Sequence, residues 1–250
     1  MRLRDAAIAV RERASPNTAE REPGVPVDVL VLHYTGMPTA AGALDRLCDP
    51  AARVSSHYLV DEDGTVWRLV DEARTAFHAG VSAWRGHEAL NARSVGVEIV
   101  NPGHEWGYRA FPAPQMDAVE ALCRAVLGRH PIPPRNVVAH SDVAPERKED
   151  PGELFPWAQL ADRGIGLWPL GVPDLGCALP VTDGAGLRPV RAALAGVGYR
   201  LALEGAQDDA LAAVLRAFQR HWRPERVTGL ADRGTRARLA ALHRLVATAG

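Results

Sequence analysis

Two histidines and one aspartate in this 250-residue chain have the residue types of a catalytic metal site. His33 and His140 each end a predicted strand, where side chains emerge at the rim of a sheet, and Asp150 follows shortly after His140. A hydrolytic zinc site has three such protein ligands and keeps a fourth position for water. The residues alone leave two interpretations open, because no compact H-x-x-x-H motif is present and a lone strand histidine is more often structural.

Glu98 could transfer protons beside such a site. It lies in the predicted strand 94–100, whose other residues are suited to burial. Burial penalises the charged carboxylate and raises its pKa toward the range that is useful for general acid–base catalysis. The alternative is a structural ion pair, for example with Arg93, and the sequence does not decide between them.

Hydrophobic patterning predicts the elements that must position these residues. The predicted strands are 27–34, 94–100 and 136–140, the predicted hairpin pairs 56–60 with 65–70, and the predicted helices are 39–47 and 114–127. Segment 76–93 has no such pattern, and a loop of this length inside a domain is usually functional. This order of strands and helices predicts an α/β domain over residues 25–168.

The composition is that of an ordinary soluble globular chain, with 47% hydrophobic and 24% charged residues. The formal net charge of −1 argues against nucleic acid as a partner. No stretch approaches the roughly 20 apolar residues that span a bilayer, so we expect no membrane span. Charged residues interrupt any export signal at the N-terminus, which predicts a cytoplasmic protein. The three separated cysteines, Cys48, Cys123 and Cys177, predict buried thiols and no disulfide framework.

The two ends of the chain differ from the α/β segment. Residues 1–24 are predicted to be a leader that forms a short helix followed by coil. Residues 169–186 are rich in Gly and Pro and predict a linker to a helical domain, 187–250. The helices of this domain are predicted at 187–196, 208–222 and 233–246. Because so small a bundle buries little core alone, we interpret it as a binding appendage.

Five segments in register resemble the zinc-dependent N-acetylmuramoyl-L-alanine amidases of the type-2 family, which share their fold with peptidoglycan recognition proteins. These segments are Leu32–Thr35, Val54–Val60, Phe77–Ser82, Ser94–Ile99 and His140–Trp157. The resemblance covers about residues 25–160 and implies a mixed central sheet flanked by helices. It also implies that the partners are peptidoglycan or muropeptide fragments. Residues 187–250 are similar to three-helix peptidoglycan-binding domains, although the same apolar spacing fits a bundle core.

The resemblance implies one Zn²⁺ per chain, held by His33, His140 and Asp150. It further implies that Glu98 takes a proton from water and later delivers it to the departing amine. Lys148 would stabilise the oxyanion of the tetrahedral transition state. The alternative for Lys148 is a solvated lysine in a charged loop.

Three further residues are expected at the substrate groove. His78 belongs to a His-Ala-Gly element of the family, and Trp84 and Asn91 are expected to line the same groove. Phe77 departs from the tryptophan that is common before this element. His57 and Tyr58 match a strand beside the metal, where a structural role is expected. The remaining histidines match no motif and are interpreted as surface residues: His87, His104, His130, His221 and His243.

Two rivals to a catalytic role in wall turnover remain. The first is a recognition module that binds peptidoglycan without cleaving it; such modules typically lack a zinc ligand, whereas all the ligands implied above are present here. The second is a phage-type lysin with the same chemistry. The missing export signal favours soluble muropeptides in the cytoplasm, whereas the helical appendage suits a polymeric wall outside it. The sequence decides neither the substrate form nor the oligomeric state.

Overall fold

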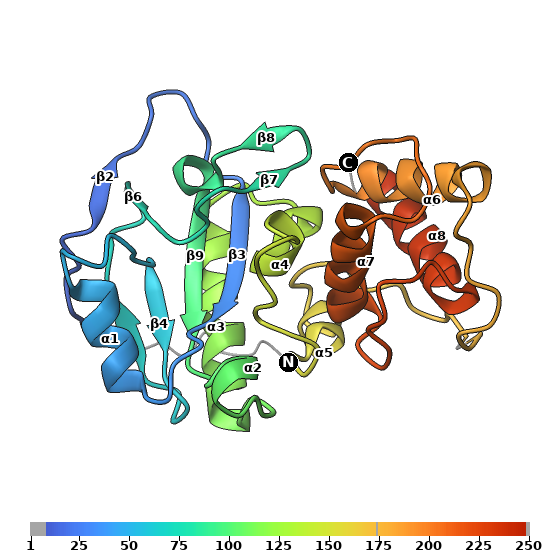
Figure 1. Cartoon of the computed structure of the whole chain (residues 1–250). Coiled ribbons are helices and arrows are strands. Elements are labelled where there is room, and N and C mark those ends of the chain that lie inside the picture. The colour runs from blue at the N-terminus through green and yellow to red at the C-terminus, as the bar shows by residue number, and fades with distance from the viewer. Residues whose placement is uncertain (1–8, 174, 249–250) are drawn as a thin grey trace.

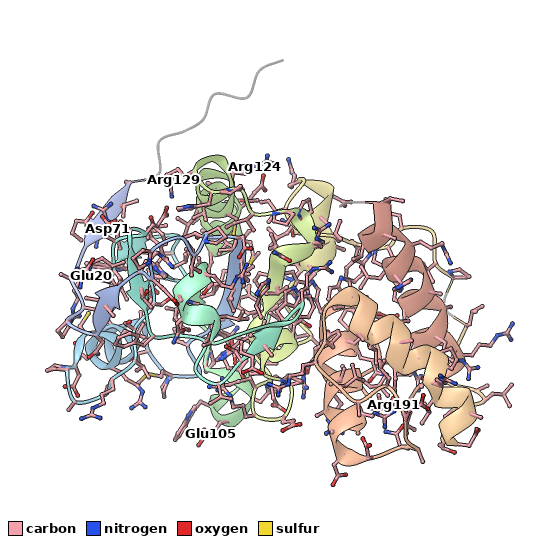
Figure 2. The ribbon with its side chains drawn as sticks, turned by 90° about the horizontal axis from the view of Figure 1, so that it is seen from above. Glu20, Asp71, Glu105, Arg124, Arg129 and Arg191 are labelled. Atoms are coloured by element: carbon pink, nitrogen blue, oxygen red, sulfur yellow. The ribbon has the colours of Figure 1, made fainter. Side chains whose placement is uncertain are left out.

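The structure, a computed structural model that describes residues 9–173 and 175–248, contains an α/β unit and a helical unit that lie side by side (Figure 1). Seen from above, the helical unit with Arg191 lies on one side of the α/β unit, and Glu20 and Asp71 lie on the opposite side (Figure 2). None of the described helices is long and apolar enough to cross a membrane.

A six-stranded mixed sheet forms the centre of the α/β unit. Its strands, in sheet order, are β1 (Val10–Glu12), β5 (Val66–Arg68), β4 (Tyr58–Val60), β9 (Ser94–Ile99), β3 (Val29–Tyr34) and β10 (Val137–Ala139). All neighbours are parallel except the β4–β5 hairpin. Strand β3 is apolar on both faces because both faces are covered, and Val29–Leu32 is at most 2% exposed. The expected α/β class with a mixed sheet is confirmed.

Helices cover both faces of this sheet. Helix α3 (Ala113–Arg129) packs Val119, Leu122 and Val126 against one face. Helix α1 (Ala40–Cys48) begins at Thr39, whose side chain accepts a hydrogen bond from the Gly42 N–H, and it packs near the sheet edge. The short helices are α2 (Gly103–Trp106), α4 (His140–Val143) and α5 (Trp157–Asp162), with 3-10 turns at Leu90–Arg93 and Pro134–Asn136.

The N-terminal segment contradicts the expected helix and coil within its described part. Strand β1 pairs with β5, and β2 (Thr18–Glu20) pairs antiparallel with β6 (Arg74–Ala76). These strands are three residues long and largely exposed, so they carry no local hydrophobic signal, and their backbone groups find partners only through tertiary pairing. The first eight residues of the expected leader lie outside the described residues. A second small hairpin joins β7 (Ala83–Trp84) to β8 (His87–Glu88).

The helical unit consists of α6 (Gly184–Val197), α7 (Asp209–Trp222) and α8 (Arg233–Thr248), which confirms the three expected helices. Its apolar residues do not form an isolated core. Leu187, Leu215 and Phe218 belong to one continuous cluster with Val31 and Val138 of the sheet. The small bundle therefore gains its core by docking on the second face of the sheet.

The cysteines only partly meet the expectation of buried thiols. All three are free, but only Cys123 is buried, whereas Cys48 is partly exposed and Cys177 is exposed. Cys177 lies in the segment that leads to α6, outside any helix or strand, and is exposed to solvent.

Candidate active site

Parallel pairing brings the candidate ligands to one edge of the sheet. His33 is the fifth residue of β3 and pairs with Glu98 of β9. His140 was expected to end a strand, but β10 ends at Ala139 and His140 is the first residue of α4. Asp150 lies in the loop after α4, where its carbonyl oxygen accepts a hydrogen bond from the Ser141 N–H at 3.0 Å. That contact closes the loop, so Asp150 returns beside His140.

The three side chains converge on one point. The two Nδ1 atoms of His33 and His140 are 2.9 Å apart, and Asp150 Oδ2 lies 3.1 Å from the first and 3.0 Å from the second. All three residues are buried. Ligands bound tetrahedrally at about 2.0–2.1 Å from a zinc ion would be separated by roughly 3.3 Å, which is close to these distances. Within the described residues this is the group of His, Cys, Asp and Glu side chains whose geometry could hold a metal.

Hydrogen bonds on the outer side of His33 leave its Nδ1 unprotonated. The Ser94 hydroxyl donates to the Leu90 carbonyl at 2.7 Å, so it accepts from His78 Nε2 at 3.1 Å. His78 Nδ1 then carries a lone pair and accepts the proton of His33 Nε2 at 3.0 Å. Burial, reinforced by the neighbouring histidines, holds the pKa of His78 well below its ordinary value and keeps this ring neutral. This series of hydrogen bonds fixes the tautomer of His33.

His140 is oriented in the same way. The Ala79 carbonyl oxygen lies 3.3 Å from His140 Nε2 and can only accept, so Nε2 carries the proton and Nδ1 carries a lone pair. Two nitrogen lone pairs and the carboxylate oxygen of Asp150 therefore face one another at about hydrogen-bond distance with no proton between them. Such an arrangement is repulsive unless a cation is bound, so the donor set fits a metal ion.

The protonation states of the cluster suit metal binding. Burial, followed by the charge of His140, lowers the pKa of His33 to about 4 despite the opposing effect of Asp150. Burial alone would raise the pKa of Asp150, but its close contacts with the rings of His140 and His33 outweigh burial and hold the pKa well below the usual range. The site thus presents a neutral His33 ring and an ionised Asp150 carboxylate near neutral pH.

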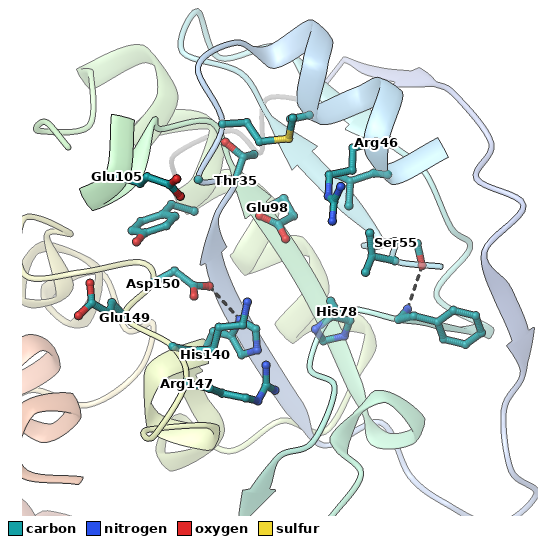
Figure 3. A pocket seen from close by; sticks show the side chains of 18 residues that line it. Thr35, Arg46, Ser55, His78, Glu98, Glu105, His140, Arg147, Glu149 and Asp150 are labelled. Atoms are coloured by element: carbon teal, nitrogen blue, oxygen red, sulfur yellow. Dashed lines mark hydrogen bonds and ion pairs between the residues drawn. The ribbon is translucent and has the colours of Figure 1, made fainter. Parts of the chain in front are cut away.

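Glu98 lies beside the cluster and points into the pocket (Figure 3). Its Oε2 is buried and has no hydrogen-bond partner among the residues that the structure describes. Burial, followed by the negative charge of Asp150, raises the pKa of Glu98 well above its ordinary value, and Lys148 partly offsets this. The alternative of a structural ion pair with Arg93 is wrong, because Arg93 binds Asp28 through two hydrogen bonds. Glu98 is therefore free to exchange a proton.

The pocket above the cluster has a volume of about 520 Å³ (Figure 3). Of the expected site residues, Glu98, Lys148, His140, Asp150 and His78 line it. Lining residues that the sequence analysis did not identify include Tyr34, Thr35, Met37, Arg46, Ser55, Glu105 and Arg147. Proximity to Lys148 in the sequence could have indicated Arg147, whereas the helix that carries Arg46 offers no such signal.

Two of the three expected groove residues lie elsewhere. Trp84 is 2% exposed and packs edge-on against Tyr199 of the helical unit, with ring centroids 5.2 Å apart. Asn91 does not line the pocket, because its Oδ1 accepts the backbone N–H groups of His78 at 3.1 Å and Ala79 at 2.7 Å. Asn91 thus holds the loop that carries His78, and Trp84 packs against the helical unit. Aromatic and amide groups serve packing and turns as readily as they bind ligands.

His78 lines the pocket but already uses both ring nitrogens within the protein. Its ring lies so close to β9 that a Cβ at Gly96 would stand 2.5 Å from His78 Cγ, so only glycine fits there. The structure therefore places His78 as the support of His33.

His57 has the expected structural contact, because the Gly96 N–H donates to His57 Nδ1 at 3.0 Å. The expectation of a surface location is wrong for His221, which is 1% exposed and whose Nδ1 lies 2.6 Å from Asp142 Oδ2. His221 is on the face of α7 that docks against the α/β unit, and helical periodicity does not reveal which partner covers a face.

The model of the family described as N-acetylmuramoyl-L-alanine amidase, Amidase_2, matches residues 23–153. N-acetylmuramoyl-L-alanine amidase AmiD of Escherichia coli K12 is 39% identical over 234 residues, which cover 86% of this chain and 82% of that protein. The 1,6-anhydro-N-acetylmuramyl-L-alanine amidase AmpD of the same organism is 30% identical and is matched over 61% of this chain and 91% of its own length.

Solved structures extend the likeness to the helical unit. Escherichia coli AmiD in complex with anhydro-N-acetylmuramic acid-L-Ala-D-gamma-Glu-L-Lys has a TM-score of 0.76 at 37% identity, covering 93% of this chain and 91% of that chain. AmpDH3 from Pseudomonas aeruginosa has a TM-score of 0.73 at 32% identity, covering 93% and 98%. Because the family match runs from before β3 to beyond Asp150, and so includes every candidate ligand, the chain belongs to the N-acetylmuramoyl-L-alanine amidase family, Amidase_2.

Proposed function

We propose that the protein is a zinc amidohydrolase that cleaves the amide between the lactyl group of N-acetylmuramic acid and L-alanine of the stem peptide. The observation that carries this proposal is the convergence of three unprotonated ligand atoms, from His33, His140 and Asp150, beside the unpaired Glu98 in a pocket. We propose one Zn²⁺ per chain at this cluster. Bound there, the ion would supply an acidified water molecule and polarise the scissile carbonyl.

The residues of the chain divide the remaining work. Glu98, whose raised pKa suits both roles, accepts a proton from the attacking water and delivers it to the leaving amine of L-alanine. Lys148 lines the same pocket and provides an ammonium for the negative charge that develops on the carbonyl oxygen. His78 keeps the lone pair of His33 directed at the cluster throughout, because its own hydrogen bonds are made on the outer side.

We propose muropeptides as the substrate class. The relative AmiD has been solved with an anhydro-N-acetylmuramic acid tripeptide, and this chain covers most of that protein. The pocket lining adds Arg46 and Arg147 to Lys148, and these positive charges suit the carboxylates of a stem peptide. The cytoplasmic location and wall binding by the unit at 187–250 stay predictions, as do the domain bounds 25–168 and 169–186.

Product mass spectrometry tests the proposed function. The protein is incubated separately with purified sacculi and with soluble anhydro-muropeptides, with a chelator and after zinc is added back. We expect peptides with a free L-alanine N-terminus and intact muramic acid, loss of both products with chelator, and recovery with zinc. Cleavage that persists in metal-free protein, or products cut in the glycan chain, would contradict the proposal. Binding of sacculi without any product would favour the recognition module instead.

A further inference from the structure

A second buried carboxylate lies on the helix that carries a proposed metal ligand. Asp142 follows His140 by two residues in α4, and its side chain is fully buried. Its Oδ2 accepts the Ala139 N–H at 2.8 Å and contacts His221 Nδ1 at 2.6 Å, and its Oδ1 accepts the Tyr199 hydroxyl at 2.5 Å. A buried carboxylate is costly unless it is fully hydrogen-bonded, and here two of the three donors come from the helical unit.

The ring of His221 is held in one orientation. It stacks between Trp157 of α5, with centroids 3.7 Å apart, and Trp222 of α7, with centroids 3.6 Å apart. Its Nε2 is buried and has no hydrogen-bond partner among the described residues, so the proton of the neutral ring resides on Nδ1 and is donated to Asp142. A flat ring fixed on both faces makes this hydrogen bond a rigid link between α7 and α4.

Helix α7 also contacts the other end of the ligand segment, residues 140–150, which carries the proposed ligands His140 and Asp150. Arg220 Nη2 binds Glu149 Oε1 at 2.7 Å, and Glu149 directly precedes Asp150. Arg220 is mostly buried, whereas Glu149 is partly exposed and lines the pocket. Helix α7 lies beside α4 (Figure 1). It therefore contacts a residue two positions after the ligand His140 and a residue one position before the ligand Asp150.

We propose that the helical unit is a positioning element of the metal centre. It acts through Tyr199–Asp142 from the connection between α6 and α7, and through His221–Asp142 and Arg220–Glu149 from α7. Helix α4 has four residues, which is too short to be stable alone, so its orientation depends on contacts from outside. Metal affinity requires ligand atoms to be held within a few tenths of an ångström. The appended unit thus contributes to the metal site of the α/β unit, whatever wall polymer it binds. This inference rests on the proposed metal site.

Two substitutions in the full chain test the proposal. Tyr199→Phe removes one hydroxyl and keeps the ring against Trp84, and Arg220→Gln removes the charge that holds Glu149. The matched control is Arg200→Gln, because Arg200 also joins the two units, through Glu88 of β8, but does not contact the ligand segment. For each protein the zinc Kd is measured by chelator competition, together with kcat, KM and Tm.

We expect Tyr199→Phe and Arg220→Gln each to raise the zinc Kd roughly tenfold and to lower kcat at similar KM, because residues behind metal ligands typically change affinity by about this factor. The control should match the wild type in zinc Kd and kcat. A lower Tm with unchanged zinc Kd and kcat in both variants would make the helical unit a stabilising support only and overturn the proposal.

Hydrogen–deuterium exchange of the metal-free proteins separates this proposal from the proposed function. Amides of residues 139–150 should exchange faster in Tyr199→Phe than in Arg200→Gln. Unchanged exchange in this segment would overturn the positioning role. A wild type that binds no zinc would instead refute the proposed metal function, and the exchange result would still report on the segment.

Discussion

Two buried histidine–carboxylate clusters lie next to each other around α4 and do different things. In the metal cluster, His33, His140 and Asp150 direct three lone pairs at one point, because the ring protons are used on the outer side. In the second cluster, every contact of Asp142 contains a proton, supplied by His221, Tyr199 or a backbone N–H. Similar residue types and distances thus give a candidate cation site in one case and a closed hydrogen-bond network in the other. The position of the protons decides the difference.

Access to solvent separates the two clusters as well. His140 and Asp150 line the pocket, whereas Asp142 and His221 are sealed between the α/β unit and the helical unit. A substrate can reach the first cluster only. Chemistry is therefore expected at the first cluster, and the second can act only through the segment that both share.

Removal of a ligand should have the largest effect. His140→Ala is expected to lower the zinc content from about one ion per chain to none and to abolish activity, because two remaining ligands bind zinc weakly. Metal analysis after gel filtration measures this. Zinc retained at one per chain would mean that the Asp142 cluster or another group binds the ion. This result would contradict the assignment of metal binding to the His33–His140–Asp150 cluster.

Loss of the proton-transfer group should be the next largest effect. Glu98→Ala is expected to keep zinc but to lose roughly 10²-fold to 10⁴-fold in kcat, since Glu98 transfers protons and does not hold the metal. Steady-state kinetics and metal content are measured on the same sample, with Glu98→Gln as the isosteric control that should behave alike. Loss of zinc in either variant would instead identify Glu98 as a ligand.

Removal of the Lys148 ammonium should have the third largest effect, and it should change kcat alone. Lys148→Ala is expected to lower kcat by about 10²-fold while KM, zinc content and Tm stay near the wild type, because the oxyanion exists only in the transition state. Lys148→Arg should recover little, because the planar guanidinium spreads its charge. An unchanged kcat in zinc-loaded Lys148→Ala would support the alternative of a solvated surface lysine.

A third histidine–carboxylate contact, between His130 and the partly buried Glu72, should show the smallest effect. Burial would raise the pKa of Glu72, but hydrogen bonds from Arg129, Tyr58 and His130 outweigh it and lower the pKa to about 2. Because this is below the ordinary value of 4.5, the stabilisation is complete above about pH 4.5 and is lost as the pH falls toward 2. Glu72→Gln should therefore lower the free energy of unfolding by about 1 to 2 kcal/mol at pH 7 and by less at pH 3.5.

Urea unfolding at the two pH values measures this difference. Glu20→Gln is the control, because Glu20 pairs with Arg74 at an exposed position and should change stability little (Figure 2). If Glu72→Gln lowers the free energy of unfolding by the same amount at pH 7 and pH 3.5, Glu72 contributes through packing rather than through its charge.

Local patterns were sufficient to predict the main elements. Strand β3 is a continuous apolar run, whereas β9 and helices α3 and α7 have apolar residues at the period of their own geometry, and the structure confirms each of these elements. The metal ligands were predicted through spaced motifs, because ligands that converge from parallel strands and one loop need a fixed order along the chain. These predictions depend on residues that are close in sequence, or on short motifs that can each be recognised without knowledge of the others.

Tertiary contacts decided what those patterns could not. Strands β1 and β2 exist only because β5 and β6 supply backbone partners, and Trp84 is buried only because the helical unit docks on it. His221 meets Asp142 across 79 residues of sequence. The sequence by itself determined the α/β order, the candidate ligand set and the three C-terminal helices. Only the tertiary structure decided which nitrogens carry protons and that the appended helices reach the metal segment, because both depend on neighbours that local periodicity does not encode.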